Sequence, residues 1–186
     1  MMRSEKQKML AGELYRASAP ELVALRVRAR GLVDLYNATA ATQGEQRRLL
    51  LSELFGSLGQ SVEIESPFFC DYGSQIHVGE GFYLNTGCVI LDCAAVTIGA
   101  HVLIAPGVHI YTATHPTDPA VRRSGLELAL PVTIGDNVWI GGGAIVCPGV
   151  TIGENTTIGA GSVVVKSIPA NVIAAGNPCR VLRPVP

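Results

Sequence analysis

Aliphatic residues recur at every sixth position through the second half of the chain. The series begins with Ile98, Ile104 and Ile110, and it continues after an interruption with Ile134, Ile140, Val146, Ile152, Ile158 and Val164. The interruption from Ile110 to Ile134 is itself a multiple of six, so the count is kept. A period of six is neither that of a helix nor that of a strand pleat, and it fits a short strand followed by a corner in a stacked coil.

The residues around each repeat position support this interpretation. A small or β-branched residue lies two positions earlier, as in Val96 and Val102, and residues i−2 and i of a strand face the same side. A glycine often follows the repeat position, as in Gly99 and Gly135, and suits a tight bend. Three such sides would close a triangular coil. We therefore expect a mainly β, parallel solenoid over residues 59–186.

The front of the chain has a different composition. Charged residues concentrate before residue 60, and Leu22, Leu25 and Leu32 follow helical spacing. The pair Ser18 and Glu21 and the pair at positions 42 and 45 have capping-box spacing, which predicts two helices. We expect residues 1–58 to form a helical segment that covers one end of the coil.

Charge and composition limit the classes of partner. The net charge is −1 with 16% charged residues, which gives no electrostatic basis for binding nucleic acid or an anionic membrane. No apolar run approaches the ~20 residues of a membrane span, and "MMRSEKQKML" lacks a signal-peptide core, so we expect a cytoplasmic protein. The five cysteines form no CxxC pair, which favours free thiols and gives no sign of a metal site.

Residues 111–131 form the one long interruption of the repeats. A flat-sided prism has no pocket of its own, so function is expected where the repeat is broken or between neighbouring prisms. His115 lies at the mouth of this loop, and an imidazole titrates near neutrality as a general base should. Pro116 stiffens the backbone beside it. The sequence thus predicts an extruded loop with His115 as a candidate base, whereas most histidines in loops have no catalytic role.

Several segments resemble one family closely. They are "EKQKMLAGELY", "CDYG", "APGVHIYTATHP", "PVTIGDNVWIGGGAIVCPGVTIG" and "AAGNPCRV". Over nearly the whole chain, the sequence is similar to the hexapeptide-repeat sugar O-acetyltransferases, the group of maltose, galactoside and nodulation acetyltransferases. The resemblance implies a left-handed parallel β-helix, a homotrimer with sites shared by two subunits, acetyl-CoA as co-substrate, a sugar as acceptor and no metal.

The resemblance also implies roles for individual residues. His115 matches the catalytic base, and Asn85 matches the asparagine that stabilises the oxyanion. The residues expected to bind the acceptor are Asp71, Tyr83, Asn85 and Asp92. Those expected to bind the coenzyme are Gly142, Ala160, Val165, Lys166, Arg180 and Arg183. "CDYG" and "LDC" look more like the maltose branch than the galactoside branch.

Other functions remain open at this point. An O-acetyltransferase could act on an antibiotic or on serine instead of a sugar. Hexapeptide solenoids also serve as non-catalytic scaffolds, although the loop with His115 argues against that. A γ-type metal hydratase needs three histidines that converge on zinc, and His77, His109 and His115 do not have its spacing.

Overall fold

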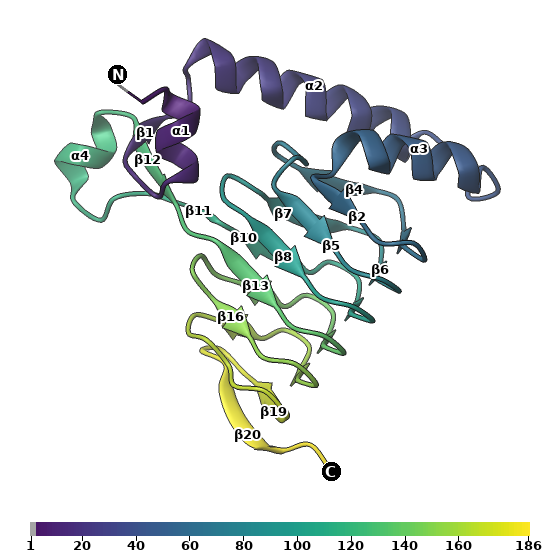
Figure 1. The fold of residues 1–186 in the computed structure, drawn as a ribbon. Helices are drawn as coiled ribbons and strands as arrows, with labels where there is room; N and C mark the ends of the chain where they lie inside the picture. Colours follow the sequence, from purple (N-terminus) through teal and green to yellow (C-terminus); the bar gives the residue numbers. More distant parts are fainter. Residues whose placement is uncertain (1–2) are drawn as a thin grey trace.

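Three sheets form a three-sided coil in the computed structural model, which describes residues 3–186 (Figure 1). Sheet I contains β4 (Phe68–Cys70), β7 (Cys88–Leu91), β10 (His109–Tyr111), β15 (Ile145–Val146) and β18 (Val163–Val164). Sheet II contains β2 (Ser57–Leu58), β5 (Ile76–Val78), β8 (Val96–Ile98), β13 (Val132–Ile134) and β16 (Thr151–Ile152). Sheet III contains β3 (Glu63–Ile64), β6 (Tyr83–Leu84), β9 (Leu103–Ile104), β14 (Trp139–Ile140), β17 (Thr157–Ile158), β19 (Val172–Ala175) and β20 (Arg180–Pro184).

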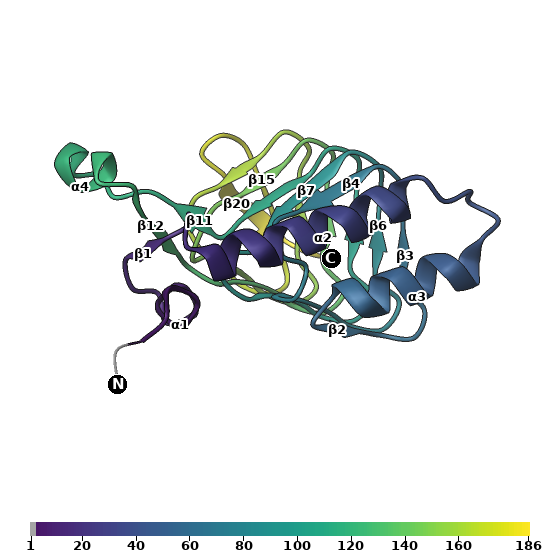
Figure 2. The same cartoon turned by 90° about the horizontal axis from the view of Figure 1, so that it is seen from above.

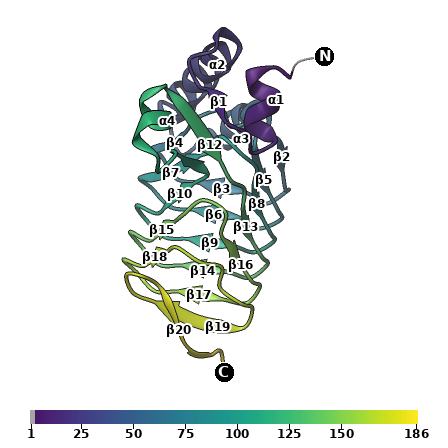
Figure 3. The same cartoon turned by 90° about the vertical axis from the view of Figure 1, so that its left-hand side faces the viewer.

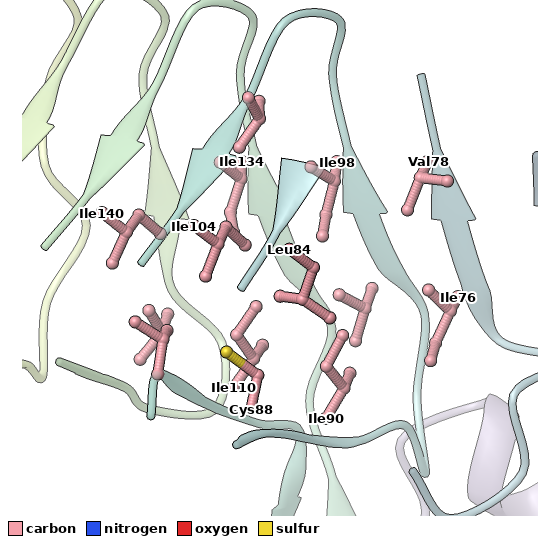
Figure 4. Packing of buried hydrophobic residues seen from close by; sticks show 14 of the residues in the cluster. Ile76, Val78, Leu84, Cys88, Ile90, Ile98, Ile104, Ile110, Ile134 and Ile140 are labelled. Carbon is pink, nitrogen blue, oxygen red and sulfur yellow. The ribbon is translucent and has the colours of Figure 1, made fainter. Parts of the chain in front are cut away.

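Parallel pairing stacks equivalent repeat positions on one another. In sheet II, Ile98 pairs with Ile134 and Ile134 with Ile152. The repeat residues point into the coil and form one continuous core (Figure 4). The positions two residues earlier are buried as well, even where they are polar, as at Thr156 and Ser162. The solenoid and its inward residues are therefore confirmed, while its left-handed sense stays a prediction.

The interruption of the repeats is an arm that projects from the coil (Figures 1 and 3). It comprises residues 112–131, with β11 (Ala113–Thr114), α4 (Pro119–Arg123) and β12 (Leu126–Ala129). β11 and β12 are antiparallel, and β12 also pairs with β1 (Tyr15–Arg16) near the amino terminus. Beyond the arm, Val132 pairs with Val96, so the register resumes as expected.

Helices cover one end of the coil, as the sequence predicts. They are α1 (Glu5–Leu10), α2 (Pro20–Asn37) and α3 (Gly44–Leu54), and α2 lies across the end of the prism (Figures 1 and 2). Ala29, Val33 and Tyr36 of α2 join the core of the coil. Along residues 3–186, none of the helices combines the length and the apolar character that crossing a bilayer requires.

The helix caps differ from the prediction. The sequence predicts that Ser18 caps the first helix, but α2 begins after Ala19 and has no side-chain cap. Ser18 lies in the turn before the helix, which is closed by a hydrogen bond from Ala19 N to Arg16 O. α3 begins after Gln43, also without a side-chain cap. A complete capping box occurs instead at Ser4, before α1, which the sequence analysis did not predict.

At its other end the coil finishes in a hairpin. β20 turns back antiparallel to β19 at the edge of sheet III. All five cysteines are free, as expected, and Cys147 is the one that is only half-buried.

Candidate active site

The predicted site residues lie on two different edges of sheet I. Its strands are parallel, so all of them begin at one edge and end at the other. The corners that enter the sheet form the glycine edge, residues 85–87, 105–107, 141–143 and 159–161. The segments that leave it form the arm edge, residues 71–75, 92–95, the arm, 147–150 and 165–167. A strand of three residues spans roughly 10 Å, so the edges are separated by about that much.

The glycine edge is a ladder of similar corners. Each corner donates a backbone hydrogen bond to a neighbouring coil, from Gly107 N to Thr86 O, from Gly143 N to Pro106 O and from Gly161 N to Gly142 O, at 2.9–3.0 Å. Three of the predicted residues, Asn85, Gly142 and Ala160, belong to this ladder. At Gly142 an added Cβ would lie 3.3 Å from Pro106 O, so only a very small residue fits without crowding that corner.

Asn85 lies at the corner between β6 and β7 and is half-buried. Its Oδ1 accepts a hydrogen bond from Thr86 N at 2.8 Å. This contact turns the carbonyl end of the amide toward the backbone. The amide nitrogen is then the end available to donate to another group.

Asp92, at the arm edge, is fully buried. Its Oδ1 accepts hydrogen bonds from Asp71 N and Tyr72 N at 3.0 and 2.8 Å, and its Oδ2 accepts one from Gln75 N at 3.2 Å. Burial raises the pKa of Asp92 to about 7, although backbone hydrogen bonds from Tyr72, Gly73 and Gln75 oppose the rise. The carboxylate therefore holds the turn that carries Asp71, a role the sequence analysis did not foresee.

Asp71 lies at the same edge and is only half-buried. Cys93 Sγ donates to its Oδ2 at 3.5 Å. Burial raises the pKa of Asp71, while the Cys93 hydrogen bond and the charges of Arg26 and Arg30 lower it. Because Cys93 occupies Oδ2, the other carboxylate oxygen is the one that can meet a ligand.

His115 follows β11 on the arm, and its side chain is exposed. The next residue, Pro116, has no N–H, so the pairing of β11 with β12 cannot continue past His115. Arg122 Nη1 donates to Pro116 O at 3.0 Å, which ties the turn after His115 to helix α4. His115 thus stands at the end of a braced ribbon beside the coil.

Two residues that were not predicted, Tyr15 and Glu127, lie beside these groups. Tyr15 of β1 is fully buried, and its hydroxyl donates to Glu127 Oε2 of β12 at 3.2 Å. The alternation of apolar and other residues in "LELAL" could have predicted strand β12. No sequence pattern indicates that β1 would pair with it.

The residues predicted to bind the coenzyme divide between the two edges in the same way. Val165 and Lys166 follow β18 at the arm edge and are exposed, whereas Gly142 and Ala160 belong to the glycine edge. Arg180 and Arg183 lie exposed on β20. Neither the catalytic pair of His115 and Asn85 nor the coenzyme group is brought together on one edge of a single chain.

The outer faces of the sheets also differ. Sheet II presents exposed threonines at positions 97, 133 and 151. The outer row of sheet I is Phe69, Val89, His109 and Ile145, and Phe69 is 44% exposed. On sheet III, Tyr83 lies in a row with Leu103 and Trp139, which is 53% exposed, between Glu63 and Thr157. The two faces that flank the glycine edge therefore carry large apolar side chains that the sheet II row of threonines lacks, together with some polar ones.

Two hollows of about 460 Å³ each lie near the capped end of the coil. One lies beneath α3 and is lined by residues such as Arg47, Arg48 and Glu63, with no predicted site residue among its walls. The other lies at the root of the arm, between Leu10, Ala94 and Leu130. From residue 3 to residue 186, no three His, Cys, Asp or Glu side chains gather in a way that could hold a metal ion.

Two family descriptions match separate parts of the chain. The maltose acetyltransferase hexapeptide capping motif matches residues 8–59. Six repeats of the bacterial transferase hexapeptide match residues 131–166. The coil and these matches define a hexapeptide-repeat transferase.

Individual relatives narrow the group. Nodulation protein L of Rhizobium leguminosarum bv. viciae is 53% identical over 97% of this chain and 95% of its own length. The crystal structure of a maltose O-acetyltransferase from Clostridium difficile 630 is 50% identical, with a TM-score of 0.98 over 99% of this chain and 98% of that chain. A galactoside acetyltransferase in complex with coenzyme A is 39% identical, with a TM-score of 0.94 over 100% of this chain and 92% of that chain. The chain therefore belongs to the maltose and galactoside O-acetyltransferase family and is an acetyltransferase. These matches confirm the resemblance drawn from its sequence.

Proposed function

We propose that the protein transfers the acetyl group of acetyl-CoA to a hydroxyl of a sugar, with His115 as the general base. The observation that carries this proposal is the arm edge, where an exposed imidazole stands on a braced ribbon and a half-buried carboxylate, Asp71, lies on the same edge. A base and a hydroxyl-binding group on one edge suit the activation of a polyhydroxylated acceptor. Membership of an acetyltransferase family supplies the group that is transferred.

The chemistry is a direct transfer. His115 takes the proton of the acceptor hydroxyl as its oxygen attacks the thioester carbonyl carbon. The tetrahedral oxyanion then collapses, the C–S bond breaks, and the imidazolium returns the proton to the departing thiolate. General base catalysis of this kind contributes roughly 10²–10⁴-fold to the rate.

Asn85 stabilises the oxyanion by donating a hydrogen bond from its side-chain amide. Its carbonyl oxygen is occupied by Thr86 N at 2.8 Å, so the amide nitrogen is free to donate as negative charge develops. A donor that is already oriented needs no reorganisation during the reaction, and one such donor contributes about 10²–10³-fold.

The acceptor is held by its hydroxyls and one apolar face. Asp71 has one carboxylate oxygen free to accept hydrogen bonds from neighbouring hydroxyls. Tyr83 offers a ring on the outer face of sheet III. Asp92 supports the acceptor indirectly, because it fixes the turn that carries Asp71.

Acetyl-CoA binds along the glycine edge and the arm edge of the coil. Gly142 and Ala160 have little or no side chain, so the pantetheine arm can approach the corner backbone closely. Val165 and Lys166 contribute from the arm edge, and the exposed guanidinium groups of Arg180 and Arg183 suit the phosphates. Related structures hold coenzyme A or acetyl-CoA, which supports the same co-substrate here.

We infer that the complete site forms between two copies of the chain in a homotrimer. His115 and Asn85 lie on opposite edges of sheet I, so they act on one substrate when the arm edge of one copy meets the glycine edge of the next. In a ring of three copies, which the family resemblance implies, each interface joins the arm edge of one copy to the glycine edge of the next and so gives three equivalent sites. The apolar outer side chains of sheet I, such as Phe69, suit burial in that assembly.

A panel of acceptors tests the activity. Purified protein is incubated with acetyl-CoA and maltose, glucose, a thiogalactoside, chitin oligomers, serine or chloramphenicol, and the released thiol is measured. We expect turnover with one or more of the sugars. Turnover restricted to serine or chloramphenicol would replace the sugar by a different acceptor, and no turnover at all would refute the proposal.

Mixing two inactive variants tests the shared site. His115→Ala and Asn85→Ala chains are each assayed alone and then after exchange of subunits. If each site draws His115 and Asn85 from different copies, about a quarter of the interfaces in an equal mixture contain both residues, and activity returns in proportion. A mixture as inactive as its components would show that both residues must come from one chain.

A further inference from the structure

The arm is a three-stranded ribbon whose third strand comes from the amino-terminal segment. β1 pairs with β12 so that Tyr15 lies opposite Glu127 and Arg16 opposite Leu126. Arg16 Nη1 also donates to Ser124 O at 2.9 Å. The arm is therefore held by a part of the same chain that lies outside the repeats.

The register of this ribbon places functional side chains in one row. β11 and β12 pair Ala113 with Ala129 and Thr114 with Leu128, and one further step of this register, beyond the last pair, would bring His115 opposite Glu127. Residues directly opposite each other in antiparallel strands point to the same face. Tyr15 and Glu127 consequently share one face of the ribbon with Ala113 and Ala129, and His115, which directly follows β11, continues that face if the register is kept.

That face is turned toward the turn that carries Asp71. Ala113 and Ala129 lie on it two residues away from the row, and they pack with Tyr15, Tyr72 and Cys93 in one apolar cluster. The imidazole of His115 is at the outer end of the row, where the ribbon leaves this cluster. The buried end of the row therefore fixes how the exposed end stands over the coil.

Polar contacts continue from the arm to the acceptor residue. The Tyr15 hydroxyl donates to Glu127 Oε2 at 3.2 Å, and Tyr15 packs in the same buried cluster as Cys93. The thiol of Cys93 donates to Asp71 Oδ2 at 3.5 Å. Burial raises the pKa of Tyr15 well above its ordinary range, so the hydroxyl remains a donor at neutral pH.

We propose that Tyr15 is a positioning residue for acetyl transfer, which sets the arm that carries His115 against the turn that carries Asp71. The inference rests on the proposed function, since it concerns the geometry of that site. Tyr15 touches neither the acceptor nor the coenzyme in this arrangement. It acts through Glu127 on the arm and through Cys93 on the coil.

The chain offers a matched control in the same cap. Tyr36 is also fully buried, and its hydroxyl donates to Ile64 O at 2.6 Å, but this contact joins α2 to the coil away from the arm. Tyr15→Phe and Tyr36→Phe each remove one buried hydroxyl and keep the ring. A difference between them reports on position in the site and not on the loss of a buried hydrogen bond as such.

Kinetics and thermal unfolding of the whole trimer then test the proposal. We expect Tyr15→Phe to lower kcat/KM for the acceptor about tenfold, as the loss of a hydrogen bond to a charged group does, with the KM for acetyl-CoA unchanged. Tyr36→Phe should lower Tm while kcat/KM stays within about twofold. In a Glu127→Ala background, Tyr15→Phe should have little further effect, because its partner is already absent.

Three results would overturn the inference. They are wild-type kcat/KM in Tyr15→Phe, an equal loss in Tyr36→Phe, and fully additive losses in the double variant. Glu127→Ala removes the acceptor of this contact from the half-buried arm. If Tyr15→Phe fails to fold, unchanged kcat/KM in Glu127→Ala alone would therefore overturn the inference. A wild-type enzyme that acetylates no acceptor would instead refute the proposed function, and this inference with it.

Discussion

Along the glycine edge every corner of the coil has nearly the same form, whereas along the arm edge no two segments are alike. The glycine edge repeats a tight corner whose backbone bonds to the neighbouring coil, and its side chains are small, as at Gly142 and Ala160. The arm edge has a turn held by Asp92, the projecting arm, and the exposed pair Val165 and Lys166. Regular corners offer backbone to a long flexible ligand, while the broken repeat offers side chains for chemistry.

The largest effect should come from the arm edge. His115→Ala removes the proposed base and should lower kcat by about 10²–10⁴-fold, as measured by thiol release under saturating substrates. The Tm should not fall, because the side chain is exposed.

His101→Asn is the matched control for that prediction. His101 lies at the corner between β8 of sheet II and β9 of sheet III, away from both edges of sheet I, with a φ of 56°. Asn137 and Asn155 adopt the same left-handed conformation at equivalent corners. An asparagine should therefore fit at position 101 without strain, and kcat should remain that of the wild type. A loss as large as that of His115→Ala would remove the special role given to the arm.

The next largest effect should come from the glycine edge. Asn85→Ala removes the amide donor and should lower kcat by about 10²–10³-fold with little change in the KM of either substrate. Steady-state kinetics with both substrates varied would measure this. A rise in the KM for the acceptor with normal kcat would instead assign Asn85 to acceptor binding alone.

Substitution of Asp71 should change the KM for the acceptor and leave the KM for acetyl-CoA unchanged. Asp71→Asn removes the charge at a half-buried site, and we expect the KM for the acceptor to rise about tenfold while the KM for acetyl-CoA stays the same. Asp92→Ala would also raise the KM for the acceptor, but it should in addition lower the free energy of unfolding by about 2–4 kcal/mol, since three backbone N–H groups lose their acceptor. Equal stability of the two variants would contradict the supporting role of Asp92.

The smallest effect should be seen at Ala160. Ala160→Leu places a larger side chain at an exposed corner, so stability should be unchanged, but the KM for acetyl-CoA should rise several-fold, about the effect of 1 kcal/mol. The KM for the acceptor should not respond. An increase in that constant instead would assign Ala160 to the acceptor site and not to the coenzyme.

The sequence by itself determined the coil and the place of its interruption. Each strand in the coil pairs with the strand of the next coil, so Ile98, Ile134 and Ile152 meet through a period that a reader can count. The same count locates the arm, and with it His115. These features are visible because each repeat packs in the same way as its neighbours.

Only the tertiary structure decided where the predicted site residues lie relative to one another. Tyr15 and Glu127 are 112 residues apart, and the two-residue strand of Tyr15 is too short to leave a periodic pattern, so no local signal predicts their pairing. The acceptor-binding role predicted for Asp92 stays a prediction, and the tertiary structure adds that the buried carboxylate accepts three backbone hydrogen bonds and so holds the turn beside it. Likewise, the separation of Asn85 from His115 follows from the direction in which parallel strands cross sheet I, which depends on how the coil closes and not on either residue.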